Sequence, residues 1–90
     1  MKIKDTFVLR NLAGSNVVVP IGGDMVDFNG MITLNESGAF LWNQIKAGKT
    51  KEELISALMT EYAGVDEATA SEDIDAFIGI LEKNGILENE

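Results

Sequence analysis

The 90-residue chain changes its hydrophobic pattern about one third of the way along. Before residue 35, apolar and β-branched residues come in short runs bounded by turn residues, which is typical of strands. After residue 35, apolar residues recur at spacings of three and four, which is typical of amphipathic helices. The pattern predicts an α+β domain with a β region at about 6–34 and helices at about 35–47, 50–63 and 66–84.

Turn signals divide the β region into two predicted antiparallel hairpins. The first joins Phe7–Arg10 to Val17–Ile21 across a Gly-Ser-Asn segment, and the second joins Met25–Phe28 to Met31–Leu34 across Asn29-Gly30. Both residues of an Asn-Gly pair tolerate the positive φ that a type I′ turn requires. Pro20 has no N–H to donate, so we expect it at a strand end or a sheet edge.

Capping residues mark where each helix begins. Asn35 is a good N-cap for the first helix, and the third begins near Asp66. Thr50, with Glu53 three residues later, has the sequence of a capping box. Each helix is expected to stop near a glycine, at 48, 64 and 85.

The apolar stripes of the helices predict which side chains face the core. In the first helix, Phe40, Leu41 and Ile45 form the stripe with Trp42 on its flank, and we expect Trp42 to be largely buried. In the third helix, Ile80 falls off the centre of the stripe, beside Ala76 and Phe77. Ile80 is therefore either an ordinary half-buried isoleucine or part of one wall of a shallow apolar groove.

The composition excludes most of the residue types on which enzymes commonly rely. The chain has neither cysteine nor histidine, so thiolate nucleophiles, thiolate metal sites and the commonest general base are all missing. No glycine-rich phosphate loop is present. The amino terminus does not resemble a signal peptide, and no apolar run is long enough to span a membrane. We therefore expect a cytoplasmic, non-enzymatic binding domain without a cofactor or a metal, and with no membrane partner.

The charge distribution argues against nucleic acid. The net charge is −8, and from residue 61 onward nine acidic residues stand against one base, Lys83. Proteins that bind nucleic acid neutralise phosphates with Lys and Arg, so this segment would repel a duplex. A winged-helix architecture is compatible with the element order, but its usual DNA-reading third helix would here be acidic.

The residues also carry a resemblance that covers about Phe7 to Leu87. The parts that match are the 31–42 stretch, Gly48-Lys49-Thr50, and the apolar positions of the second helix. The third helix and the tail also match, and the residues concerned are Leu54, Leu58, Tyr62, Asp73-Ile74, Phe77-Ile78, Leu81 and Gly85-Ile86-Leu87. Together they resemble the PqqD family, which includes the pyrroloquinoline quinone (PQQ) biosynthesis protein D. The motifs are mostly core and cap residues, so the spacing of the whole carries the resemblance.

The resemblance implies a peptide-binding chaperone, the recognition element for precursors of ribosomally made, modified peptides (RiPPs). Such domains have a winged helix-turn-helix-like fold in which an amino-terminal sheet takes up the leader of the precursor as an extra strand, packed against the third helix. The peptide is then presented to a modifying enzyme, often a radical SAM protein. The whole of 1–90 would form one such domain. Because an unpaired edge strand permits pairing between copies, we expect a monomer or a weak dimer.

Carried onto this sequence, the peptide site would have a strand wall and a helix wall. The receiving edge could be either Met25–Phe28 or Met31–Leu34, because this chain has an extra segment at 21–29 compared with shorter family members. The expected peptide-binding residues are Met25, Val26, Asp27, Phe28, Met31, Ile32 and Thr33 on the strands, and Ile74, Phe77, Ile78, Ile80 and Leu81 on the third helix. Two alternatives stay open: a DNA-binding winged-helix regulator, and a structural subunit that docks on an enzyme.

Overall fold

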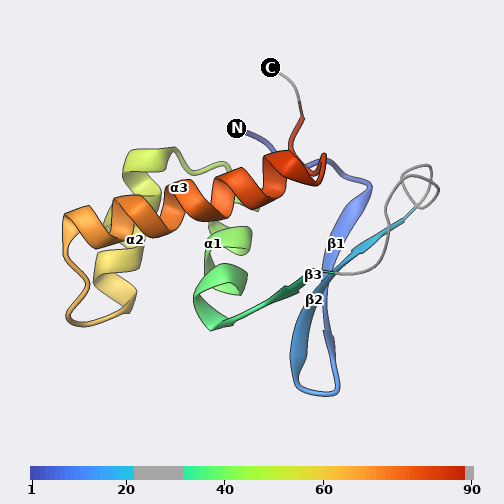
Figure 1. The fold of residues 1–90 in the computed structure, drawn as a ribbon, viewed down its shortest axis with the longest axis horizontal. Helices are drawn as coiled ribbons and strands as arrows, with labels where there is room; N and C mark the ends of the chain where they lie inside the picture. Colours follow the sequence, from blue (N-terminus) through green and yellow to red (C-terminus); the bar gives the residue numbers. More distant parts are fainter. Residues whose placement is uncertain (22–31, 89–90) are drawn as a thin grey trace.

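The computed structural model describes residues 1–21 and 32–88. It has the predicted α+β, winged helix-turn-helix-like architecture, with amino-terminal antiparallel strands followed by three helices (Figure 1). The elements are β1 (Phe7–Leu12), β2 (Ser15–Pro20), β3 (Ile32–Leu34), α1 (Glu36–Lys46), α2 (Lys51–Glu61) and α3 (Glu67–Lys83). The three predicted helices are therefore confirmed, with ends within about two residues of those expected.

The first hairpin is longer and tighter than predicted. Leu12 pairs with Ser15, so only Ala13 and Gly14 form the turn. Both have positive φ, 52° and 86°, as a two-residue type I′ turn requires. Pro20 is the last residue of β2, which confirms its expected place at a strand end.

The described sheet has three strands in the order β1-β2-β3, and β3 pairs with β2 through Val17↔Thr33 and its neighbours. The predicted second hairpin, at 25–34 with its Asn29-Gly30 turn, lies largely outside the described residues. Only its final segment, β3, is described. Within the described parts of the chain, β3 is an edge strand with no partner on its other side.

All three expected helix caps are confirmed. The side-chain oxygen of Asn35 accepts from Gly38 N–H at 2.8 Å, and that of Asp66 accepts from Thr69 N–H at 2.8 Å. At the start of α2, Thr50 Oγ1 accepts from Glu53 N–H while Glu53 Oε1 accepts from Thr50 N–H, which completes the capping box. Local side-chain chemistry therefore determines where each helix begins.

Two of these caps should make stability depend on pH. Hydrogen bonds from Thr69 N–H and from Thr50 N–H, the largest causes, lower the pKa values of Asp66 and Glu53 below their ordinary 3.8 and 4.5. A lowered folded pKa adds stability above the ordinary value, and that stability is lost as pH falls through the folded pKa. We expect the melting temperature of Asp66→Asn/Glu53→Gln to fall less than that of the parent on acidification below about pH 4. Parallel melting curves at every pH would contradict this.

A single core joins the sheet to the helices. Its fully buried side chains come from every part of the chain that the structure describes, and the largest is Trp42, which is 2% exposed. The prediction of a buried Trp42 is confirmed. The stripe of α1 is rotated relative to the prediction, since Leu41, Trp42 and Ile45 are buried while Phe40 is only partly buried and meets Tyr62 edge to face.

The two ends of the described chain lie together (Figure 1). Ile3 and Leu87 form an antiparallel β-bridge, and Ile3 and Ile86 are each at most 1% exposed. The amino-terminal residues therefore close the core beneath the end of α3, although their sequence is mostly polar.

Candidate peptide-binding groove

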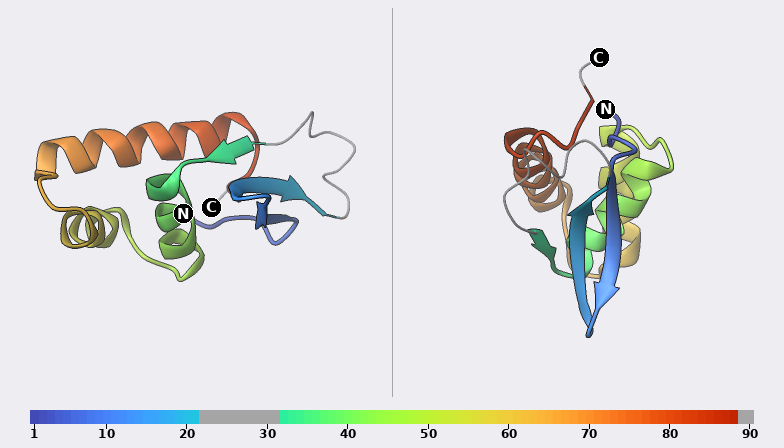
Figure 2. Two further views of the ribbon diagram at one scale, coloured as in Figure 1. Left: turned by 90° about the horizontal axis from the view of Figure 1, so that it is seen from below. Right: turned by 90° about the vertical axis from the view of Figure 1, so that its right-hand side faces the viewer.

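A groove of about 440 Å³ separates the edge strand β3 from α3. Figure 2 shows β3 as the strand nearest α3, with the β1–β2 hairpin farther away. The groove is lined by Thr33, Leu34, Asn35, Ser37, Gly38, Leu41, Leu58, Asp73, Ala76, Phe77 and Ile80. Its walls are thus β3, which is an edge strand among the residues that the structure describes, and one face of α3.

The helix wall follows from the spacing of α3. Asp73, Ala76, Phe77 and Ile80 stand at i, i+3, i+4 and i+7, which places them on one face. Phe77 is 7% exposed and reaches down into the core, whereas Ile80 is 45% exposed at the rim. The groove therefore has an apolar floor and an accessible apolar rim.

The structure brings only some of the expected peptide-binding residues to this groove. Thr33, Phe77 and Ile80 line it, and Ile32 is partly buried against the core in the same strand. Five expected residues lie outside the described part of the chain: Met25, Val26, Asp27, Phe28 and Met31.

The other three expected residues are elsewhere on α3. Ile74 and Leu81 have no exposed surface and belong to the core, so they support the helix wall from behind. Ile78 lines a different hollow, beside Met1 and Leu87 near the chain ends. Among the described candidates, an occupant of the groove would therefore touch chiefly Thr33, Phe77 and Ile80.

Sequence reasoning missed the contribution of α1 to the groove. Asn35, Ser37 and Gly38 form its end near the start of α1. A glycine at the third helical position was the available signal, because glycine is a poor helix former and needs a reason to be there. A Cβ on Gly38 would lie 3.1 Å from Asn35 Oδ1 and 3.3 Å from Leu34 Cβ.

These distances predict opposite outcomes for two glycine-to-alanine changes. In an open helix the change stabilises by about 0.5–1 kcal/mol, and at Gly79 a Cβ would meet nothing within 4 Å. At Gly38 we expect a loss of about 1–3 kcal/mol, because the added methyl crowds the cap and the strand. Denaturant unfolding measures both variants. Stabilisation by Gly38→Ala equal to that by Gly79→Ala would show that the end of the groove near the start of α1 is not tightly packed.

A second hollow, of about 570 Å³, continues the groove past the start of α1 toward the α2–α3 connection. The two hollows share Asn35, Ser37, Leu58 and Asp73. Glu36 and Asp73 are the carboxylates among the lining residues of the two. None of the chain's seven Lys and Arg residues lines either hollow.

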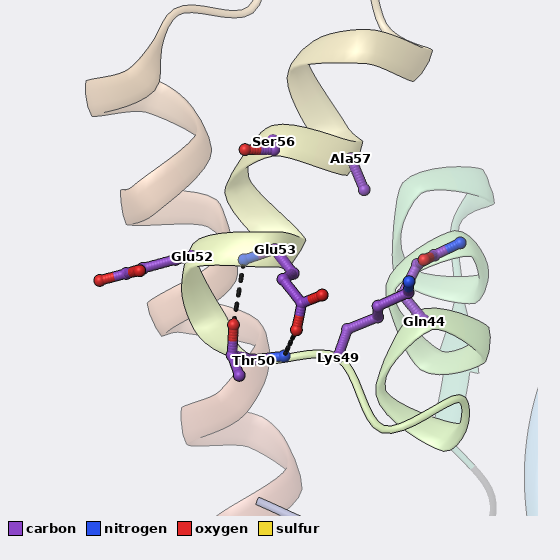
Figure 3. Close-up of a pocket in the computed structure, with 7 residues that line it drawn as sticks. All are labelled: Gln44, Lys49, Thr50, Glu52, Glu53, Ser56 and Ala57. Carbon is purple, nitrogen blue, oxygen red and sulfur yellow. Dashed lines mark hydrogen bonds between the residues drawn. The ribbon is translucent and has the colours of Figure 1, made fainter.

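A further hollow lies between α1 and α2, where Figure 3 shows Thr50 and Glu53 joined by the two capping bonds. Its polar groups are thus partly paired within the helix start, and Gln44 and Lys49 project beside it. No group of three or more Asp and Glu side chains in the described segments could hold a metal ion. No helix in the described ranges is long and apolar enough to cross a membrane.

Two solved structures resemble the whole chain. The first, described as TbiB1 in complex with the TbiA(beta) leader peptide, has 27% sequence identity and a TM-score of 0.80, with 100% of this chain and 98% of that chain covered. The second, lasso peptide synthetase B1 complexed with the leader peptide, has 19% identity and a TM-score of 0.79, with 98% and 96% covered, and it supports the fold.

A comparison with protein-family models also covers nearly the whole chain. No curated protein matches the chain. The family model of Coenzyme PQQ synthesis protein D (PqqD) matches residues 8–87, nearly the whole sequence, as the resemblance in the sequence predicts. The chain belongs to the PqqD family.

Proposed function

We propose that this protein binds the leader of a ribosomally made precursor peptide as an added strand on β3 and presents the peptide to a modifying enzyme. The observation that carries the proposal is the edge strand β3 facing the apolar side of α3 across an accessible groove. A similar solved structure with 27% sequence identity is described as a complex with a leader peptide, which supports this proposal.

Backbone pairing alone would bind the leader weakly. β3 has three residues, so an added strand gains on the order of two or three hydrogen bonds of about 0.5–1.5 kcal/mol each. Association itself costs at least about 4 kcal/mol in lost freedom. Apolar side chains of the leader must therefore supply much of the affinity, by burial against Phe77, Ile80 and Leu34.

The protein's own role in this proposal is non-catalytic. Residues 1–90 act as one binding unit, and the Ile3–Leu87 bridge that joins the two ends of the described chain supports this. The chemistry would then belong to a partner, for which the family resemblance suggests a radical SAM enzyme. Sequencing the genes on either side tests this: a short precursor frame beside a radical SAM gene supports it, and neither being present counts against it.

The groove itself is tested by selection from a phage-displayed library of random linear peptides on the immobilised full chain. An added strand turns every second side chain toward the groove, so the selected peptides should carry apolar residues at alternate positions. Selected peptides should also lose affinity for Ile80→Glu. Absence of enrichment, or equal binding to that variant, would overturn the proposal.

A salt titration with mixed-sequence duplex DNA tests the regulator alternative. In α3, five acidic residues stand against Lys83 alone, so phosphate contacts are disfavoured. We expect no binding at any salt concentration. Binding that weakens steeply with added salt would favour the DNA-binding alternative instead.

A further inference from the structure

The hollow beyond β3 differs in chemistry from the groove between β3 and α3. Its apolar base is made by Leu58, Tyr62, Ala63 and Val65, at the end of α2 and the start of the following connection. Its charged groups are the exposed carboxylates of Glu36 and Asp73. Neither carboxylate forms an ion pair with any described residue.

We propose that the leader continues past the Leu34 end of β3 and places a Lys or Arg side chain in this hollow, with its charged end toward Glu36 and Asp73. This inference rests on the proposed function and adds a specificity determinant to it. The hollow is reached directly from the groove, because Asn35, Ser37, Leu58 and Asp73 line both.

Shape and charge both favour a long basic side chain. Lys and Arg carry an aliphatic stem that packs on apolar surface while the charged end stays near water. Tyr62 offers a partly buried ring, oriented by its edge-to-face contact with Phe40 at 5.9 Å, on which a cation can rest. The two carboxylates are exposed, and no Lys or Arg among the described residues lines the hollow beside them.

The start of α1 is the feature that would favour the opposite charge. A helix amino terminus attracts anions, since its first N–H groups are unpaired. Here Asn35 Oδ1 already accepts from Gly38 N–H at 2.8 Å and from the Ser37 hydroxyl at 3.1 Å. Glu36 adds a negative charge in the first turn. The protein's own groups therefore already satisfy and neutralise this helix end, so it does not favour an anionic side chain of the leader.

The experiment repeats the peptide selection on three forms of the full chain: the parent, Glu36→Gln/Asp73→Asn, and Glu72→Gln. Glu72 is an exposed carboxylate on α3 that lines neither hollow, so it is a matched control. The parent and the control should enrich Lys or Arg at a constant position flanking the alternating apolar segment. The double variant should keep the apolar alternation and lose the basic preference.

Calorimetric titration of one selected peptide measures how much each carboxylate contributes to the binding affinity. Each carboxylate removed should weaken binding about two- to fivefold at low salt, the range of exposed ion pairs, and the effect should shrink as salt is raised. The same peptide with its basic residue replaced by methionine should bind the parent and the double variant equally.

Two outcomes overturn this inference while leaving the proposed function standing: apolar alternation without a flanking basic preference, or a flanking preference for Asp or Glu. A third outcome overturns both, namely peptides whose binding does not depend on Ile80. The failure of the basic subsite is thus distinguishable from the failure of the groove.

Discussion

Replacement of Trp42 by alanine is expected to lower the free energy of unfolding by about 3–5 kcal/mol. Trp42 is 2% exposed in the core that joins sheet and helices, and its loss leaves a cavity that this small domain can only partly fill. A domain of this length is stable by roughly 5–13 kcal/mol, so the change removes a large share of the total.

Denaturant unfolding followed by far-ultraviolet circular dichroism measures this effect, because Trp42 is the chain's one tryptophan and its fluorescence is lost in the variant. Met59→Ala is a matched control, since Met59 is a large apolar side chain that is 40% exposed. It should cost much less. Equal losses in the two variants would show that Trp42 does not anchor the core.

Ile80→Glu is expected to abolish most of the peptide affinity while the protein remains folded. Ile80 is 45% exposed at the rim of the groove, so the carboxylate stays in water in the free protein. In the complex it replaces an apolar contact with a charge. Loss of such an anchor costs about 2–4 kcal/mol, which is at least about a thirtyfold weaker complex.

Calorimetric titration of a selected peptide measures this loss, with circular dichroism to confirm folding. Met59→Glu places the same charge on an exposed helix position that lines neither the β3–α3 groove nor the hollow that extends it. That variant should bind as the parent does. Unchanged affinity of Ile80→Glu would show that the peptide does not bind in the β3–α3 groove. Unfolding of Ile80→Glu would show that Ile80 is a core residue.

The features that the sequence predicts well are those decided by local chemistry. The caps at Asn35, Thr50 and Asp66 each depend on a side chain three residues or fewer from the backbone group it satisfies. Helix spacing likewise predicted that Ile80 falls outside the core stripe, as its 45% exposure confirms. Such signals need no knowledge of the rest of the fold.

The features that the sequence misses depend on contacts between distant segments. Ile3 is a core residue that forms a β-bridge with Leu87, a residue far from it in the sequence. Gly38 gains its role from the approach of Leu34 and Phe77 to the start of α1. The sequence predicts Ile74 and Leu81 as peptide-binding residues. In the structure they lie on the core face of α3, which supports the groove, and not on the face that lines it. Periodicity gives the faces of a helix, but tertiary packing decides which neighbour each face meets.

The central claim, that a peptide adds to β3 as a strand, is tested most directly by amide hydrogen exchange of Ile32–Leu34. The measurement compares the free protein with the protein saturated by a selected peptide. Strand addition pairs N–H groups of β3 that no described residue now pairs, so their exchange should slow markedly on binding. Unchanged exchange in β3 at saturation, with slowing confined to other elements, would contradict the account.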